Sequence, residues 1–321
     1  MNEAPETGTE TDTETGTEIP PELVTQMTGW RRDFHRHPEP GFAEERTSAH
    51  IASLLESFGI EVHRNIGKTG IVGILQRGNG PGSIAFRADM DALPVTETGT
   101  PEWVSVHDGA MHACGHDGHT AMLLGAACHL AAKGDFNGRI VFIFQPNEEH
   151  GQGARAMIDD GLFQRFPADA VFAMHNIPGM KAGSFATRAG PMTASESLFE
   201  LSVTARGGHA ALPHMGVDAI LVGAQLVTAL QSIVSRKLDP ARNGVVSITE
   251  FITDGSRNVL PSSALLKGDA RALSDDTNHA IEAHMRRIAA GIAAAHDVDI
   301  KVTYDTIFPS LTNDCLLYTS D

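Results

Sequence analysis

The feature that most limits what this chain can fold into is the segment from residue 111 to 176, where three polar clusters are separated by short apolar runs. It holds MHACGHDGH, then QPNEEH after the run RIVFIF, then AMHN after AVF. Strands that alternate with helices predict an α/β layer, and such folds place ligands where strands end. We therefore expect these motifs to meet at one edge of a sheet.

The side chains in these motifs are a thiol, imidazoles and carboxylates: Cys114, His116, His119, Glu148, Glu149 and His175. Thiolate and imidazole suit zinc, whereas carboxylates suit harder ions such as manganese. One carboxylate of the Glu148–Glu149 pair can bind a metal while the other moves a proton. Metal-assisted hydrolysis needs that division of labour, so the sequence predicts a metal-dependent hydrolase.

Each of these residues also has a simpler interpretation. Cys114 alone could be a small buried hydrophobe, and the glutamate pair could be an exposed acidic helix start. Cys114 could also act as a thiol nucleophile with His116 as its base. That alternative leaves Glu148 and Glu149 unused, whereas a metal site uses all four residues. Asp91, in RADMDALP, is expected to support a metal-binding imidazole from behind.

The other histidines carry less information. His209, in RGGHAALPH, lies among glycines and a proline, where a structural turn explains it as well as a functional role does. We expect the early histidines at the surface or on helix faces and assign them no role: His35, His37, His50 and His63.

Two domains with different patterns of strands and helices are expected. Residues 19–189 begin with a helix of regular apolar spacing and then alternate strands with helices, including a buried strand at 170–174. Residues 190–306 follow the order β-α-β-β-α-β, the ferredoxin-like split unit, which we expect to be inserted into the first domain. Residues 1–18 are rich in Thr, Glu and Gly, and we expect a disordered acidic tail there.

Composition excludes several classes of partner. The net charge of −16 disfavours a nucleic acid, because phosphate backbones are bound by clustered Lys and Arg. We expect no membrane span, since no apolar run looks long enough. The 3 cysteines are too few and too scattered for a disulfide framework, which favours a cytoplasmic protein.

Seven motifs in this order resemble one branch of a known family, and they are RRDFHRHPEPGFAEERT, RADMDALP, MHACGHDGH, QPNEE, AMHN, GGHAALPH and NVLP. They resemble the hippurate hydrolase and auxin-conjugate hydrolase branch of the aminoacylase/carboxypeptidase metallopeptidases. The resemblance implies amide hydrolysis of N-acyl or N-aroyl amino acids, with a dipeptidase or aminopeptidase of the same family as the alternative. It also implies a zinc-peptidase-like catalytic domain and an inserted lid domain that forms a homodimer.

The resemblance further implies two divalent metal ions, zinc or manganese, with nickel and cobalt also compatible. Cys114 resembles the ligand that bridges both metals, and His116 with Glu149 resembles the rest of the first metal's shell. His175 resembles a ligand of the second metal. Glu148 resembles the general base that takes a proton from water.

In the expected lid, the resemblance assigns three residues. His209 resembles the histidine that reaches the partner subunit's site and stabilises the oxyanion. Asn258, in NVLP, resembles a residue near the substrate's carboxylate, and Arg271 is a second candidate for that role.

The resemblance stops after FPSLTND. The last seven residues, CLLYTSD, do not match the family, and we expect them to be translated adapter sequence joined to a truncated reading frame. On that expectation, a final histidine ligand of the second metal and the closing part of the catalytic domain are missing. The second hypothesis from the sequence is therefore a non-catalytic fragment or a binding relative.

Overall fold

The computed structural model describes residues 19–315, so the expected tail at 1–18 and all but the first residue of CLLYTSD lie outside the described residues. The chain divides into two compact units between Pro178 and Gly179. The sequence had suggested a boundary at 189–190, where the strand rhythm changes.

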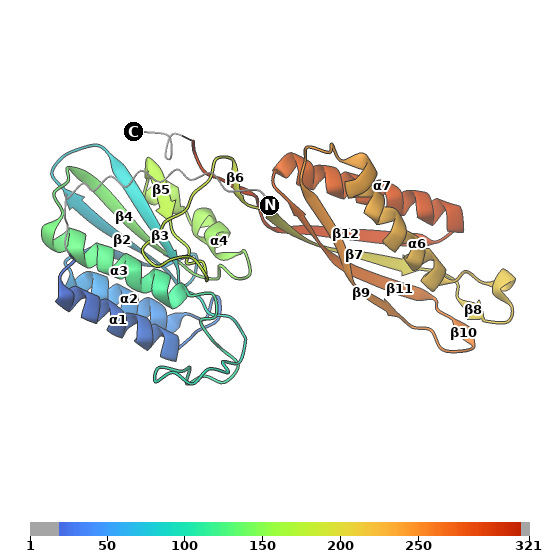
Figure 1. The fold of residues 1–321 in the computed structure, drawn as a ribbon, viewed down its shortest axis with the longest axis horizontal. Helices are drawn as coiled ribbons and strands as arrows, with labels where there is room; N and C mark the ends of the chain where they lie inside the picture. Colours follow the sequence, from blue (N-terminus) through green and yellow to red (C-terminus); the bar gives the residue numbers. More distant parts are fainter. Residues whose placement is uncertain (1–18, 316–321) are drawn as a thin grey trace. The chain divides into compact units, whose positions relative to one another are not determined.

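The first unit is built on a five-stranded mixed sheet (Figure 1). Its strands are β1 (Glu61–Ile66), β2 (Gly70–Arg77), β3 (Ser83–Asp89), β4 (Gly138–Gln145) and β5 (Ala170–Ala173). Their order is β1-β2-β4-β3-β5, and β3 runs parallel to both β4 and β5. Parallel neighbours end at the same edge, so the segments that follow these three strands converge.

Helices cover both faces of this sheet. The apolar faces of α1 (Pro21–Arg36), α2 (Glu45–Ser57) and α3 (His116–Lys133) pack on one side around Phe34, Leu124 and Phe142. The short helices α4 (Gly153–Asp159) and α5 (Leu162–Arg165) pack on the other side through Met157 and Leu162. Each such large apolar side chain stabilises the fold by about 1.5–3 kcal/mol when it is fully buried. This packing fixes the edge of the sheet relative to the start of α3.

Two strands differ from the sequence prediction. The run at 170–174 was expected to be a buried strand, and this is wrong, because β5 is an edge strand whose Val171 and Phe172 are 44% and 37% exposed. An apolar run predicts a strand, but it does not show whether another layer covers it. Strand β1 was missed altogether, since only Ile66 of its six residues is buried and the others are polar or partly exposed.

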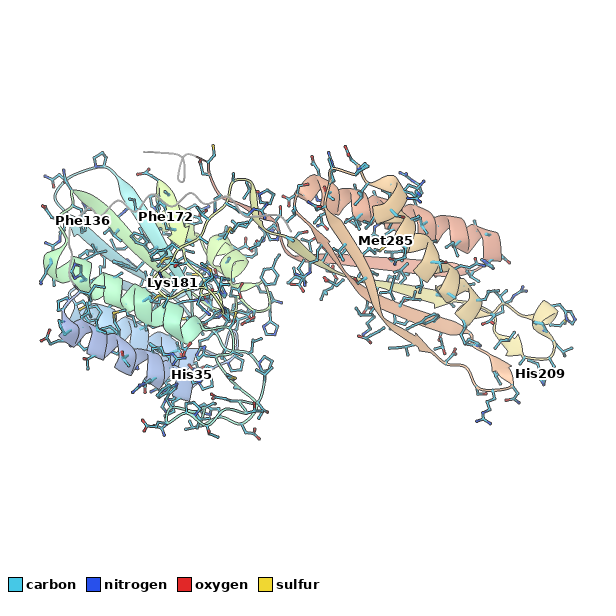
Figure 2. The ribbon with its side chains drawn as sticks, viewed as in Figure 1. His35, Phe136, Phe172, Lys181, His209 and Met285 are labelled. Carbon is cyan, nitrogen blue, oxygen red and sulfur yellow. The ribbon has the colours of Figure 1, made fainter. Side chains whose placement is uncertain are left out.

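The second unit is a four-stranded antiparallel sheet with two helices. In chain order it contains β7 (Ser195–Thr204), α6 (Ala219–Ser232), β9 (Gly244–Thr253), β11 (Ser263–Ala272), α7 (Asp275–His296) and β12 (Asp299–Phe308). The strand order β12-β7-β11-β9 with this chain order is the ferredoxin-like arrangement, as the sequence predicted. A single core joins both helices to the sheet through side chains such as Phe199, Leu226 and Met285, of which Met285 is labelled in Figure 2.

Short elements complete the second unit. They are β6 (Pro191–Thr193), β8 (Gly208–His209), η1 (Pro213–Met215), η2 (Ile233–Lys237), β10 (Val259–Leu260) and β13 (Leu311–Thr312). β8 pairs with β10, and β6 pairs with β13. The pairing of β8 with β10 brings the His209 loop beside the NVLP segment.

One stretch of the described residues, Ala219–Lys237, has the length and composition of a membrane span, with a mean hydropathy of 1.3. The expectation that no apolar run is long enough is therefore wrong, because α6 continues directly into η2. Val222, Leu226 and Leu230 of this stretch are completely buried in the core of the second unit. A core helix passes the same test, so length and composition alone are weak support for a span.

Candidate metal centre

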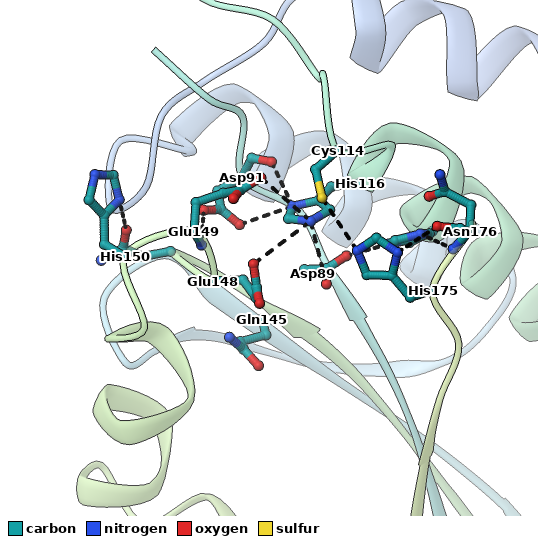
Figure 3. A network of polar contacts seen from close by, with 12 residues as sticks. Asp89, Asp91, Cys114, His116, Gln145, Glu148, Glu149, His150, His175 and Asn176 are labelled. Atoms are coloured by element: carbon teal, nitrogen blue, oxygen red, sulfur yellow. Dashed lines mark hydrogen bonds and ion pairs between the residues drawn. The ribbon is translucent and has the colours of Figure 1, made fainter. Parts of the chain in front are cut away.

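The predicted motifs meet at the edge of the first unit's sheet (Figure 3). Asp89 ends β3 and Asp91 follows it, Glu148 and Glu149 follow β4, and His175 follows β5. The turn before α3 approaches them closely because Gly115 has a φ of +89°, which few other residues adopt. A Cβ on Gly115 would also lie 2.3 Å from Oδ1 of Asn176, so this close approach requires glycine.

Potential ligand atoms gather in three groups that share His116, and one of them joins it with Asp89 and His119. Cys114, His116 and His175 offer atoms within 4.8 Å of one another, and so do His116, Glu148 and Glu149. Sγ of Cys114 lies 3.3 Å from Nε2 of His175. Nε2 of His116 lies 3.8 Å from Oε1 of Glu149 and 3.9 Å from Oε2 of Glu148. The predicted ligands and the predicted base therefore form one cluster.

Unsatisfied buried atoms show that this cluster suits a cation. Nε2 of His116, Oε1 of Glu149 and Oδ1 of Asp91 are buried and have no hydrogen-bond partner. Native proteins seldom leave such atoms unpaired, because each costs about 1–3 kcal/mol, and a metal ion would satisfy the first two. A thiol nucleophile at Cys114 would not use the glutamate, so the geometry favours a metal centre over that alternative. The thiolate, imidazole and carboxylate donors suit a divalent ion.

The contact between Cys114 and His175 shifts the pKa values of both side chains. Contacts with His116 and His175 lower the pKa of the Cys114 thiol, although burial opposes this. The contact with Cys114 raises the pKa of His175 to about 9, against the effect of burial. Nδ1 of His175 also donates to the carbonyl oxygen of Asn176 across 2.7 Å. A metal at Nε2 would therefore replace one proton and leave the orienting bond at Nδ1 in place.

Asp91 lies directly behind the His116 ring. Nδ1 of His116 donates to the carbonyl oxygen of Asp91 across 3.0 Å, and its Oδ1 is 3.4 Å away. Oδ2 of Asp91 accepts the backbone N–H of Glu149 across 3.1 Å. Burial lowers the pKa of His116, but contacts with Asp91 and Cys114 outweigh it and raise that pKa to about 11. Asp91 thus touches both His116 and the turn that carries Glu149.

His119 is close to the cluster but both of its nitrogens are occupied. Nδ1 donates to Oδ1 of Asp89 across 2.6 Å, and Nε2 accepts the backbone N–H of Asn176 across 3.0 Å. Arg87 pairs with Oδ2 of the same aspartate at 2.7 Å. Burial opposes ionisation of Asp89, but the His119 hydrogen bond and the Arg87 charge hold its pKa well below its usual range. His119 therefore supports the centre and offers it no free lone pair.

The two glutamates have similar surroundings but different support. Burial raises the pKa of both carboxyls. The backbone of Glu149 is held by Asp91, and its side chain is 15% exposed. The side chain of Glu148 is 28% exposed and no hydrogen bond holds its carboxylate among the described contacts. Glu148 is thus the more accessible carboxylate, which suits proton transfer.

The three site residues predicted in the second unit fall into two places. His209 and Asn258 are neighbours, since His209 pairs with Val259 and the N–H of Ala210 donates to the carbonyl oxygen of Asn258 across 3.0 Å. Arg271 lies near the other end of β11 and pairs with Glu196 and Asp269, each at 2.8 Å. Strand rise separates Asn258 from Arg271 by more than about 20 Å, so the structure does not bring them together.

A buried network beside the centre was missed by the sequence analysis. His35 was expected at the surface or on a helix face; it lies on α1, but it is buried, with only 4% of it exposed. Its Nδ1 lies 2.8 Å from Oδ2 of Asp117 and its Nε2 lies 3.1 Å from Oε1 of Glu97. Arg31 also pairs with Asp117 at 2.7 Å. The helical spacing of Arg31 and His35 on one face was the only signal in the sequence.

The fold and this cluster define a metal-dependent hydrolase of the α/β class. The family model described as Peptidase family M20/M25/M40 matches residues 85–318, and the chain belongs to that family. Members of this family hydrolyse amide bonds, so the protein is an amide-bond hydrolase and the predicted family is confirmed.

Curated relatives match most of the chain. It is 43% identical over 293 residues to the hippurate hydrolase of Campylobacter jejuni, covering 91% of this chain and 76% of that protein. It is 40% identical over 288 residues to the N-acyl-L-amino acid amidohydrolase of Geobacillus stearothermophilus, covering 88% and 77%. A crystal structure of a Bacillus subtilis dinuclear metal-binding peptidase of the M20 family matches with a TM-score of 0.78 at 35% identity, covering 92% and 77%.

Proposed function

We propose that this protein hydrolyses the amide bond of N-acyl or N-aroyl amino acids, giving a carboxylic acid and a free amino acid. The observation that carries the proposal is the Glu148–Glu149 pair beside the buried His116 imidazole. Nε2 of His116 and Oε1 of Glu149 lie 3.8 Å apart, and neither has a hydrogen-bond partner. The names of the hippurate hydrolase and the N-acyl-L-amino acid amidohydrolase support the substrate class. A dipeptidase or aminopeptidase of the same family remains the alternative.

Two divalent metal ions are the proposed cofactors. Cys114, His116 and Glu149 would hold the first, and Cys114 with His175 would hold the second. When bound, such ions supply Lewis acidity that activates water and polarises the scissile carbonyl. Zinc or manganese is proposed, with nickel or cobalt also compatible with this mixture of donors. The dinuclear M20 peptidase supports a count of two.

Glu148 is the proposed general base. Burial raises the pKa of its carboxyl toward neutrality, which improves it as a proton acceptor. It takes a proton from the attacking water and then delivers it to the leaving nitrogen. Asp91 holds His116 and Glu149 in place, so that proton transfer starts from a fixed geometry.

His209 is proposed to stabilise the oxyanion in the site of a partner subunit. Nδ1 of His209 accepts the backbone N–H of Ala211 across 3.0 Å, so the neutral ring carries its proton on Nε2 and can donate there. One such donor contributes about 2.7–4 kcal/mol to the transition state in comparable sites. Asn258, next to His209, is proposed to contact the substrate's carboxylate. Arg271 is the less favoured candidate, because two carboxylates already pair with it.

This role requires a homodimer, which we propose to form through the second unit. Supporting it, the edge strand β9 exposes Val245, Phe251 and Ile252, and the outer face of α6 exposes Ile220 and Leu221. Exposed apolar patches and unpaired strand edges are typical of protein interfaces. The free thiols of Cys114 and Cys128 support a cytoplasmic location.

Replacing Glu148 with Gln tests the proposal. Turnover of N-benzoyl and N-acetyl amino acids should fall about 10²–10⁴-fold, because the base is lost, while bound metal stays unchanged. The matched variant Glu149→Gln should instead lose metal. Retained turnover in Glu148→Gln, or loss of its metal, would overturn the assignment of the base. Turnover confined to peptides with free amino termini would favour the dipeptidase alternative.

A further inference from the structure

Glu44 is a completely buried carboxylate that lies outside the metal centre. It sits at the N-cap of α2, in the PEPGFAEERT segment, and its residue is 0% exposed. Oε2 accepts the hydroxyl of Thr69 across 2.6 Å. Oε1 accepts the backbone N–H of Asn147 across 2.9 Å, although the two residues are 103 positions apart in the chain. A buried acid with both oxygens engaged holds a specific arrangement of its partners.

Asn147 is the residue immediately before the glutamate pair, and its backbone is unusual. Its φ is +44°, in the left-handed region that residues other than glycine seldom adopt. Its carbonyl oxygen accepts the N–H of Gly153 across 3.0 Å, and its Oδ1 pairs with Nδ1 of His150 at 2.9 Å. A Cβ on Gly41 would lie 1.8 Å from that Oδ1, so the PEPGF segment packs directly on the Asn147 side chain.

A strained residue persists only where its surroundings over-determine it. At Asn147, the carboxylate of Glu44 fixes the N–H and Gly153 fixes the carbonyl group. The backbone leaves this residue toward Glu148 and Glu149, so the direction of both carboxylates depends on that one conformation. The motif around Glu44 has no contact with the metal ligands among the described hydrogen bonds. Holding the turn at Asn147 gives this motif a role in the site.

We propose that Glu44 is a positioning residue for the reaction, because it holds the N–H of Asn147 and thereby directs Glu148 at the attacking water and Glu149 at the metal. This rests on the proposed function of those two residues. Outer partners of metal ligands and small misplacements of catalytic groups each change rates by about 10–100-fold.

The experiment compares four variants of the full chain. Glu44→Ala removes the acceptor, and Glu44→Asp keeps the carboxyl group but withdraws it by about one methylene. The aspartate variant leaves a smaller cavity and so disturbs the fold less. Both should lower kcat about 10–100-fold with KM changed only a few-fold. Glu44→Gln still offers an oxygen to Asn147 and should recover most of the rate. Thr69→Val removes the other hydrogen bond to Glu44 and is the matched control.

Amide hydrogen exchange of residues 145–153 in the metal-free chain gives a readout without turnover. Exchange there should rise in Glu44→Ala and Glu44→Asp, and stay at the parental level in Glu44→Gln and Thr69→Val. Parental kcat and exchange in both Glu44→Ala and Glu44→Asp would overturn the proposal. The proposal would also be overturned if Thr69→Val lost as much kcat as Glu44→Ala and had the same melting temperature as that variant. The two variants would then share a general loss of stability. An active Glu148→Gln would instead refute the proposed base. The exchange measurement would still test whether Glu44 holds the turn at Asn147.

Discussion

The backbone N–H of Asn176 donates a hydrogen bond to Nε2 of His119 across 3.0 Å. This contact joins the first turn of α3, which begins with His116, to the segment that carries His175. Asp89 accepts a hydrogen bond from Nδ1 of His119, so both nitrogens of the imidazole are held. The two halves of the candidate centre are thus tied together by a histidine that need not touch a metal.

Replacing His119 with Ala should weaken metal binding about 10–100-fold, because the His175 segment loses its anchor and Asp89 loses a partner. The measurement is a competitive titration with a chelator at fixed pH. His129→Ala, a half-buried histidine on the same helix, should bind metal as the parent does. Unchanged affinity in His119→Ala would refute the anchoring role, whereas complete loss of one metal equivalent would show that His119 is a ligand.

His35 should make the stability of the first unit depend on pH. Its hydrogen bond with Asp117 is the largest cause that raises the pKa of His35 above 6.5, and burial opposes it. Since the folded pKa lies above the unfolded one, the stabilisation is fully present below about pH 6.5 and is lost as the pH rises through the folded pKa. Asp117, whose pKa is lowered against the effect of burial, loses its contribution as the pH falls.

Unfolding by denaturant at several pH values measures this effect. The free energy of unfolding should decrease as the pH rises above about 6.5, and His35→Gln should flatten that slope. His35→Ala should lower the free energy of unfolding by about 1–3 kcal/mol near pH 6, because Asp117 and Glu97 each lose a hydrogen bond while Arg31 still pairs with Asp117. His37→Gln, at the partly exposed end of the same helix, is the control and should keep the parental slope. An unchanged slope in His35→Gln would contradict the assignment.

The sequence predicted the site residues that lie in short local motifs, but not those whose role depends on contacts between distant parts of the chain. Glu148 and Glu149 follow an apolar run, and Cys114 and His116 stand in a short motif before a helix, so strand ends and donor types predicted their meeting. Glu44 and Asn147 form one hydrogen bond across 103 positions, and no local pattern marks it.

Burial was harder to predict than secondary structure. The apolar residues of β5 predicted a strand correctly, but its exposure depends on its place at the sheet edge. His35 has the pattern of an ordinary helix residue, and its buried contacts are with Asp117 and Glu97, which are far away in the sequence. In the second unit, alternating apolar residues gave the ferredoxin-like order without help, because each strand has one face on a single core.

Subunit mixing tests the proposed role of His209. A His209→Ala chain and a Glu148→Gln chain should each be nearly inactive alone. In their heterodimer, one site would combine an intact Glu148 with an intact His209 from the other chain, so a random mixture should recover about one quarter of parental turnover. The control is either variant mixed with itself. If the mixture stays inactive while labelled subunits demonstrably exchange, His209 does not act across subunits.

The two proposed metals should differ in affinity. On the proposed assignment, three donors serve the first ion (Cys114, His116 and Glu149), whereas two, Cys114 and His175, serve the second. A catalytic zinc usually has three protein ligands and a water, so the second set is one donor short of that count. Dialysis of the zinc-loaded chain against a weak chelator should therefore leave nearer one than two ions per chain, measured by elemental analysis. His175→Ala should leave this tightly held ion in place, while His116→Ala should remove it. Two ions of equal affinity would show that a further side chain completes the second site.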